Sequence, residues 1–196
     1  MSKFNAIGIM SGTSLDGVDL AFCSFSENKP GAFEIVQGET SAYSVLWTNK
    51  LANASQLNAV EFEKLKVDYS LEIAHTVDRF RNKFGLPRPD ILAFHGHTIF
   101  HRPDLGFTTQ LGCGATLATS TGIPTVFDFR SGNVALGGQG APLVPIGDAQ
   151  LFPMFDACVN LGGFANISLK DDGKITAFDI CPANIVLNEY ALKCGQ

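Results

Sequence analysis

Residues 8–19 read Gly-Ile-Met-Ser-Gly-Thr-Ser-Leu-Asp-Gly-Val-Asp and lie between two apolar runs, Phe4 to Ile9 and Val18 to Phe25. An apolar run, a polar glycine-rich segment and a second apolar run predict a β-hairpin. Glycines at positions 8, 12 and 17 allow positive φ and close approach of the backbone, and the hydroxyls of Ser11, Thr13 and Ser14 can donate hydrogen bonds to a phosphate. The stretch therefore predicts a hairpin turn that can bind an anion.

Two carboxylates in the same stretch, Asp16 and Asp19, would repel a bare phosphate. They suit a phosphate that carries Mg²⁺, because this ion is usually held by one or two carboxylates together with the oxygens of the nucleotide. A glycine-rich hairpin turn without a ligand explains the same residues. The stretch alone leaves both interpretations open.

The composition is that of a globular protein with a small-molecule partner. Of the 196 residues, 45% are hydrophobic and 17% charged, which is enough apolar surface for a buried core. The formal net charge of −5, without a cluster of Lys and Arg, argues against a nucleic-acid partner. Five scattered cysteines with no CxxC pair indicate reduced thiols and a cytoplasmic protein. No apolar run is long enough to predict a signal peptide or a membrane span.

Beyond the hairpin, strands and helices are predicted in an α/β order. Residues 32–45 predict a third strand, and an amphipathic helix runs from near Leu57 until Gly85 and Pro87 end it. The apolar run 91–94 predicts a buried strand that ends in His95-Gly96-His97-Thr98, the position at which open α/β sheets place binding residues. The next predicted elements are a helix at 114–121, a strand at 124–127 with the exit Asp128-Phe129-Arg130, a glycine-rich loop at 137–142 and a helix at 143–151.

From residue 155 the opening pattern is repeated. Residues 157–159 predict a strand, 160–166 a glycine turn, 167–169 a returning strand, 175–178 another strand and 182–192 a helix. Such an internal repeat suggests a second domain of the same design. We therefore expect a first domain at 1–154 and the beginning of a second at 155–196. About forty residues are too few to close a core of their own, so the second domain is expected to be incomplete.

Six sequence blocks occur in the order in which they occur in anhydro-N-acetylmuramic acid kinases, and the chain resembles the first half of a full-length member of that family. The blocks are Gly12 to Asp19, His95 to Thr98, Asp128 to Arg130, Gly137 to Leu143, Asn160 to Asn166 and Asp179 to Asn184. The resemblance implies the actin-like ATPase (ribonuclease H-like) fold, an α/β fold with a mixed sheet and flanking helices. In that fold ATP lies between two related domains.

The resemblance also implies a reaction. In this family water opens the 1,6-anhydro bridge of the sugar, and the freed 6-hydroxyl takes the γ-phosphoryl group of ATP, which gives N-acetylmuramic acid 6-phosphate. The implied ATP-binding residues are Gly12, Thr13, Ser14, Leu15, Asp16, Gly17, Val18 and Asp19 in the first phosphate loop, with Gly162, Gly163 and Asp179 in the second half. The resemblance also implies that Asp16 and Asp19 lie near Mg²⁺ and hold it through water. The implied sugar-binding residues are His95, Gly96, Thr98 and Arg130.

A general base is also required, because proton removal accompanies the attack of water on the anomeric carbon. The family has an aspartate just before its Val-Ala-x-Gly-Gly run, and Asn133 occupies that position here. An amide has the shape of a carboxylic acid but does not accept the proton. Three further departures are His97 in place of the usual glutamine, Cys181 in place of glycine and Asn188 where an acidic residue is common.

Two other functions remain open. Asn133 and the short second domain favour an inactive homologue or fragment that binds nucleotide or sugar without turnover. His95, His97 and His101 also have spacings that suit a zinc ion, which would indicate a metal-dependent hydrolase. The apolar surface of an incomplete second domain predicts a covering partner, either a second copy in a homodimer or the carboxyl-terminal half of a longer protein.

Overall fold

The computed structural model describes residues 3–26 and 32–195. The chain divides into two compact units, residues 1–138 and 139–196, and each is described by itself. This division falls earlier in the chain than the expected start of a second domain at 155. The difference is helix α5 (Val144–Leu151), which packs on strand β8 (Phe164–Asp171) of the second unit. That the two units are actin-like domains stays a prediction.

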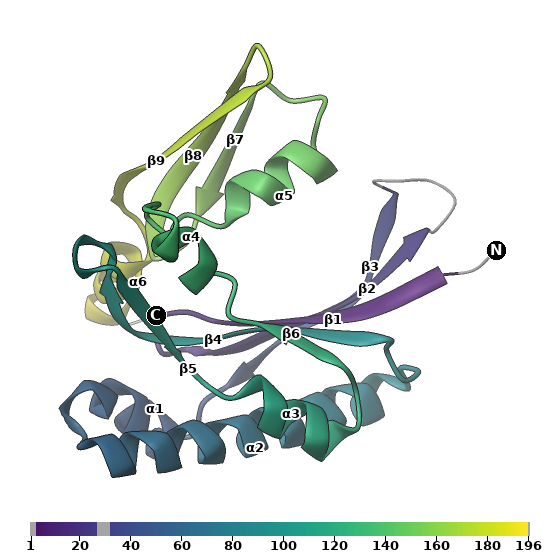
Figure 1. Cartoon of the computed structure of the whole chain (residues 1–196), viewed down its shortest axis with the longest axis vertical. Helices are drawn as coiled ribbons and strands as arrows, with labels where there is room; N and C mark the ends of the chain where they lie inside the picture. The colour runs from purple at the N-terminus through teal and green to yellow at the C-terminus, as the bar shows by residue number, and fades with distance from the viewer. Residues whose placement is uncertain (1–2, 27–31, 196) are drawn as a thin grey trace. The chain divides into compact units, whose positions relative to one another are not determined.

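The first unit is built on a mixed sheet (Figure 1). Strand β1 (Lys3–Ser11) pairs antiparallel with β2 (Gly17–Ser26), which pairs antiparallel with β3 (Phe33–Ala42). On its other side β1 lies parallel to β4 (Ile91–Arg102), and β4 pairs with the antiparallel β5 (Phe107–Leu111) and the parallel β6 (Thr125–Phe127). The strand order β3-β2-β1-β4-β5 places the loop after β1 and the middle of β4 next to each other.

Helices α1 (Val45–Ala52), α2 (Ala59–Phe84) and α3 (Gly114–Thr121) lie on one side of this sheet (Figure 1). A capping box begins α2, since the Asn58 side chain accepts from the Glu61 amide and the Glu61 side chain accepts from the Asn58 amide. The left-handed Gly85 ends it. Alternate residues of the strands and one face of α2 form the core, which includes Ile7, Ile9, Leu20, Phe22, Tyr69, Ile73, Val77, Leu92 and Phe94. Short helices η1 (Ala54–Gln56), η2 (Pro103–Leu105) and α4 (Ser131–Ala135) complete the unit.

The second unit is a three-stranded antiparallel sheet with helices. It contains β7 (Ala157–Leu161), β8 and β9 (Lys174–Pro182) in the order β7-β8-β9, followed by α6 (Asn184–Lys193). A buried hydrogen bond of 2.7 Å from the Ser168 hydroxyl to the Asp148 carboxylate joins β8 to α5. Lys170 Nζ donates to the carbonyl oxygens at the end of the same helix. These contacts explain why α5 belongs to this unit.

The sequence predicts most of these elements correctly. Both glycine-rich hairpins, the third strand, α2, α3, β6 and α5 lie where they are expected, and the mixed sheet with flanking helices is consistent with the actin-like fold. One expectation is wrong: His95 to Thr98 lie inside β4 rather than after it, because β5 pairs with β4 from His97 onward. Helices α1 and α4 and strand β5 were not predicted.

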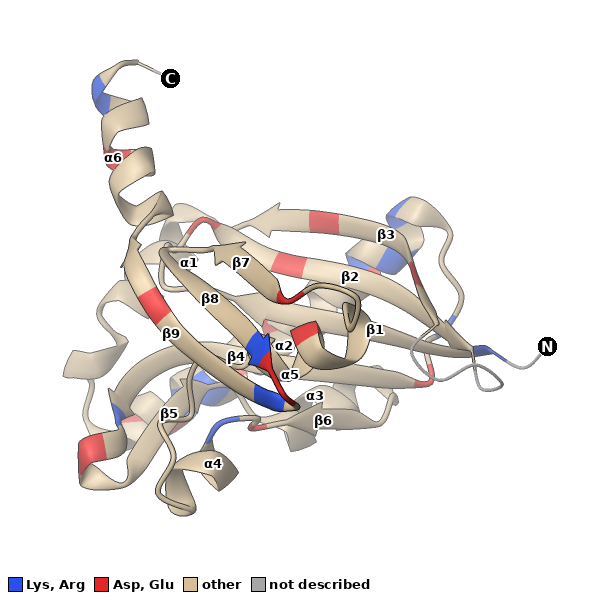
Figure 2. Ribbon diagram, turned by 90° about the horizontal axis from the view of Figure 1, so that it is seen from above, with Lys and Arg blue, Asp and Glu red and all other residues tan. Residues whose placement is uncertain are grey.

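Charge and hydropathy add two observations. Lys and Arg (blue in Figure 2) and Asp and Glu (red) are dispersed over separate elements. Among the described residues, none of the helices combines the length and the apolar character that a membrane crossing requires.

Candidate functional site

The loop between β1 and β2 has a defined conformation. The Leu15 amide donates to the Gly12 carbonyl at 3.4 Å, and the Ser14 hydroxyl donates to Asp16 Oδ1 at 2.8 Å. Leu15 has a left-handed φ of 59°, which is uncommon for a bulky residue, and its side chain packs against the core. Thr13 and Ser14 are exposed. The packing of Leu15 thus holds a strained turn that presents hydroxyl groups to solvent.

The glycines at positions 8, 12 and 17 allow positive φ and close approach of the backbone. In the described chain the left-handed residue of this loop is Leu15 and none of these glycines. Gly17 is required for close packing instead, since a Cβ there would lie 2.6 Å from the carbonyl oxygen of Ser41 in β3. Val18 is buried in the core, so only its backbone can take part in binding.

Asp16 and Asp19 fit the role of outer ligands of a hydrated cation. Both side chains are exposed, and each accepts one hydrogen bond on Oδ1, from Ser14 and from Thr40 respectively. Exposed carboxylate oxygens are the hard ligands that Mg²⁺ prefers, and Mg²⁺ keeps several of its waters. The donor set therefore fits this ion.

A β-bulge in β4 shapes the next part of the site. The pairing of β1 with β4 shifts between Ile9 and Ser11, and Gly96 in the shifted part of β4 has φ 77°. A Cβ at Gly96 would lie 2.7 Å from the carbonyl oxygen of Leu111, so a larger residue does not fit without movement of β5. Bulges with a left-handed glycine change the direction of neighbouring side chains. The two histidines that flank Gly96 accordingly have different partners.

His95 is buried and has a fixed tautomer. Arg130 Nε donates to His95 Nε2 at 2.9 Å, so His95 Nδ1 carries the hydrogen and donates to the Gly96 carbonyl at 2.8 Å. Burial lowers the pKa of His95, the hydrogen bond to Gly96 opposes this shift, and the charge of Arg130 adds to it. Burial also lowers the pKa of Arg130. At neutral pH the imidazole of His95 is therefore uncharged.

His97 ends a chain of buried hydrogen bonds. Its Nδ1 lies 2.7 Å from Ser11 Oγ, which lies 2.6 Å from the Tyr43 hydroxyl, and this hydroxyl lies 2.6 Å from that of Tyr69. Burial, with a smaller contribution from His95, lowers the pKa of His97 to about 4. Burial likewise raises the pKa of Tyr69 and Tyr43. The Tyr43 amide also donates to the Asp16 carbonyl, so the chain is tied to the first loop.

Sequence reasoning missed the two tyrosines of this chain. No motif indicates that Tyr43, in the segment before α1, meets Ser11, or that Tyr69, in the middle of α2, meets Tyr43. The only signal in the sequence is that a buried tyrosine hydroxyl on the apolar face of a helix needs a partner.

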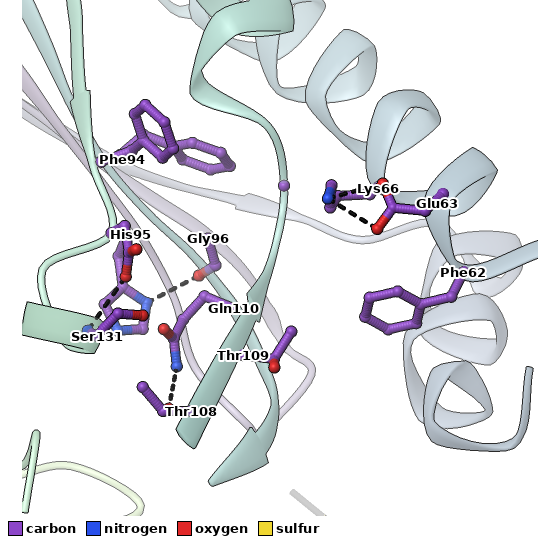
Figure 3. Close-up of a pocket in the computed structure, with 13 residues that line it drawn as sticks. Phe62, Glu63, Lys66, Phe94, His95, Gly96, Thr108, Thr109, Gln110 and Ser131 are labelled. Atoms are coloured by element: carbon purple, nitrogen blue, oxygen red, sulfur yellow. Dashed lines mark hydrogen bonds and ion pairs between the residues drawn. The ribbon is translucent and has the colours of Figure 1, made fainter. Parts of the chain in front are cut away.

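A pocket of about 240 Å³ adjoins His95 (Figure 3). Figure 3 shows His95, Gln110 and Ser131 on one side and Glu63, Lys66 and Phe62 on helix α2. The residues that line it are Phe62, Glu63, Lys66, Phe94, His95, Gly96, Thr108, Thr109, Gln110, Gly112, Phe127, Asp128 and Ser131. Two of the predicted sugar-binding residues, His95 and Gly96, lie in this pocket, and Arg130 contacts His95.

A second pocket, of about 170 Å³, adjoins the first loop. It is lined by Thr13, Leu15, Leu51, Ala52, Ser55, His97, Thr98 and Ile99. Thr98, the remaining predicted sugar-binding residue, therefore lies in a different pocket from His95. Because Thr13 and Leu15 line the same pocket, the loop predicted to bind phosphate and a residue predicted to bind sugar come together here.

Asn133 lies in α4, just beyond β6. Asp128 precedes this helix with φ 59°, and its carboxylate accepts from the Ser131 amide at 3.2 Å. The Asn133 side chain is exposed and lies against Gly138, where a Cβ would be 2.2 Å from Asn133 Oδ1. The Gly138 amide donates to the Asn133 carbonyl at 2.9 Å. The glycine-rich segment thus turns back onto the position at which a general base is expected.

In the second unit, Gly162 and Gly163 form the turn between β7 and β8. Their carbonyls accept from the amides of Asn184 and Ala183 at 3.0 and 2.8 Å, and Asn184 Nδ2 donates to the Leu161 carbonyl at 3.1 Å. The turn is therefore fastened to the beginning of α6. Asp179 is exposed in β9, where it pairs with Asn166 of β8.

The zinc alternative has no ligand set in the described part of the chain. Within residues 3–26 and 32–195, no three His, Cys, Asp or Glu side chains gather in a way that could hold a metal ion. The three histidines bond elsewhere instead, His95 to Arg130, His97 to Ser11 and His101 to Thr108.

Comparison with known proteins agrees with the motif analysis. A family model described as anhydro-N-acetylmuramic acid kinase matches residues 4–195. Proteins of the same description are 40% identical in Colwellia psychrerythraea, 39% in Paramagnetospirillum magneticum and 36% in Rhizobium johnstonii. The alignments cover 94–95% of this chain but 50–54% of the relatives, so the chain spans about half the length of the curated relatives it matches.

Proposed function

Since the chain belongs to the anhydro-N-acetylmuramic acid kinase family, we propose that it contributes the first phosphate loop and the sugar pocket of an ATP-dependent sugar kinase. The proposed reaction opens the 1,6-anhydro ring of anhydro-N-acetylmuramic acid with water and transfers the γ-phosphoryl group to the 6-hydroxyl. The observation that carries the proposal is the second pocket, in which the phosphate loop and the histidine strand β4 meet.

ATP is the proposed phosphoryl donor, with its phosphates bound by the two glycine-rich turns. Thr13 and Ser14 would donate hydroxyl hydrogens to phosphate oxygens. Gly162 and Gly163 of the second unit are proposed as ATP-binding residues as well. A bound Mg²⁺ would neutralise charge on the transferred phosphoryl group. Asp16 and Asp19 would hold the waters of this ion.

The anhydro sugar is proposed to bind along β4. Gln110 and Ser131 lie in the same pocket as His95 and provide neutral donors and acceptors that suit the hydroxyl groups of a sugar, while both nitrogens of His95 are bonded within the protein. Arg130 fixes the tautomer of His95 and so positions it. The proposal places the neutral donors and acceptors of this pocket against the hydroxyl groups of the sugar, and Glu63, Lys66 and Asp128 are the charged residues of its lining.

Proton removal from water is the step of the proposed reaction for which this site lacks the expected carboxylate. Asn133 occupies the position of the expected general base, and its amide does not accept the proton during the attack. General-base catalysis typically contributes about 10²- to 10⁴-fold to a rate. We therefore expect the protein to bind ATP and the anhydro sugar with slow turnover. A binding protein without turnover is the second candidate, and Asn133 is the observation that favours it.

Restoring the carboxylate tests the assignment. Asn133→Asp is expected to raise the release of ADP from ATP in the presence of the anhydro sugar by about 10²- to 10⁴-fold. Asn82→Asp on the exposed surface of α2 adds the same charge away from the pockets and serves as the control. No gain with Asn133→Asp, in a protein that binds both ligands in calorimetry, would support the second candidate and refute the role of this position. A protein that binds neither ligand would refute both candidates.

A further inference from the structure

The hydrogen-bond chain that ends at His97 has a preferred direction. Tyr69 is fully buried, and the rings of Trp47 and Phe94 pack against it. If its hydroxyl donates to Tyr43, Tyr43 donates to Ser11 and Ser11 donates to His97, every hydroxyl hydrogen has an acceptor. The reverse direction would leave the Tyr69 hydrogen in the apolar core, and a buried unsatisfied donor is destabilising.

This direction fixes the tautomer of His97. Nδ1 accepts from Ser11, so the hydrogen of the neutral ring is on Nε2. His97 lines the second pocket, and among the described residues Nε2 has no hydrogen-bond partner in the protein. The neighbouring His95 has the opposite tautomer, because its Nε2 accepts from Arg130. His97 is therefore a fixed hydrogen-bond donor whose N–H is left for a ligand.

The rest of the second pocket indicates which ligand group fits this donor. Leu15, Leu51 and Ile99 provide apolar surface, while Thr13, Ser55 and Thr98 provide hydroxyls. The described residues of its lining include no Lys, Arg, Asp or Glu, so a neutral substituent fits the part of the pocket next to His97 better than a carboxylate does. A neutral group with one strong acceptor and a methyl matches it best.

We propose that His97 determines specificity by donating from Nε2 to the carbonyl oxygen of the acetamido group of an amino sugar, with the acetyl methyl against Leu15, Leu51 and Ile99. This proposal rests on the proposed function, since it assigns one substituent of the sugar to one part of the same site. Ser11, Tyr43 and Tyr69 are positioning residues, because they act on the ligand only through the ring of His97.

Binding of two sugars without nucleotide tests the proposal. Calorimetry would compare 1,6-anhydro-N-acetylmuramic acid with the analogue that has a hydroxyl in place of the acetamido group. We expect the wild-type protein to prefer the acetamido sugar by about 30-fold, because a methyl pocket and a hydrogen bond are both lost with the analogue. In His97→Ala the preference should fall below about threefold on the same reasoning. His97→Gln retains an N–H donor and should keep most of the preference.

His101→Ala is the matched control, since it removes a histidine of the same strand that is bonded to Thr108 and lies outside both pockets. It should keep the full preference. A measurement that requires no substitution is the ¹⁵N NMR signal of His97, which should show the hydrogen on Nε2 in the wild type. A signal from the Nδ1–H tautomer would overturn the proposal.

The failure of this proposal differs from the failure of the proposed function. If the wild type binds both sugars equally, or if folded His97→Ala keeps the preference, the role of His97 is wrong while sugar binding stands. If the wild type binds neither sugar, the proposed function and the role of His97 are both refuted.

Discussion

Replacing Gly96 with alanine tests whether the bulge in β4 depends on a residue without a side chain. Gly96 has φ 77°, and its missing Cβ would lie 2.7 Å from the Leu111 carbonyl oxygen and 3.0 Å from Gln110 Cβ. Gly106, between β4 and β5, has the same φ of 77° but no atom within 4 Å of the corresponding position. The pair therefore separates the two costs of a Cβ, backbone conformation and lack of space.

The expected magnitudes follow from these two terms. A left-handed conformation costs a residue with a Cβ about 1 kcal/mol, and this should be the whole effect of Gly106→Ala. Overpacking against fixed backbone adds about 2 kcal/mol, so Gly96→Ala should lower the free energy of unfolding by about 3 kcal/mol. To make room for the new Cβ at position 96, β5 would have to move, and this movement would displace His95 and His97. We therefore also expect weaker sugar binding in Gly96→Ala and not in Gly106→Ala.

Urea unfolding followed by tryptophan fluorescence provides the assay. Trp47 is the only tryptophan in the chain and is buried in the first unit, so its signal reports that unit. With a denaturant slope of about 2 kcal/mol/M, the midpoint should fall by about 1.5 M for Gly96→Ala and about 0.5 M for Gly106→Ala. Equal shifts in the two variants would refute the argument that the space at Gly96 matters.

Three further predictions concern other contacts. The pKa of His97 is about 4 in the folded chain, and its ordinary value of 6.5 applies to the unfolded chain, so the unfolded chain takes up the proton first as pH falls. The contribution of neutral His97 to the free energy of unfolding is thus complete above about pH 6.5, and up to about 3 kcal/mol of it is lost as pH falls toward 4. The lowered pKa of His95 acts in the same direction. The urea midpoint should therefore depend less on pH in His97→Gln than in the wild type. Asn58→Ala removes the capping box of α2 and should destabilise the first unit by about 1 kcal/mol in the same urea assay. Ser168→Ala leaves the buried Asp148 carboxylate without its donor, so hydrogen exchange of amides in α5 should become faster by about tenfold or more, and unchanged exchange would contradict a role in holding α5 on β8.

Local patterns explain why so much of the fold could be predicted. The hairpin at residues 4–25 and the helix that ends at Gly85 follow from the spacing of apolar residues and from the glycines that mark turns and helix ends. Both signals act over a few residues. Strand β5 and helix α4 lack such signals, since Phe107 to Leu111 contains three consecutive polar residues and α4 has only five residues. These elements form because β4 and the residues after β6 provide partners for them.

The candidate site could be predicted in part for the same reason. The motifs identified the loop at 12–19 and the strand of His95, and the structure brings Thr13 and Thr98 to one pocket. The chain from Tyr69 to His97 could not be predicted, because it joins residues from four separate segments through contacts that exist only after folding. The bulge at Gly96 is equally invisible in the sequence, although it decides which partner each histidine has.

The surroundings of Asn133 argue that the effect proposed for this residue is on proton transfer and not on shape. Its side chain lies against Gly138, where any larger residue would overlap Oδ1. Aspartate has almost the same outline as asparagine, so a carboxylate fits the same space without movement of the glycine-rich segment. Asn133→Asp should therefore change the urea midpoint little while it changes turnover, and a large loss of stability would show that the amide nitrogen of Asn133 holds this segment together.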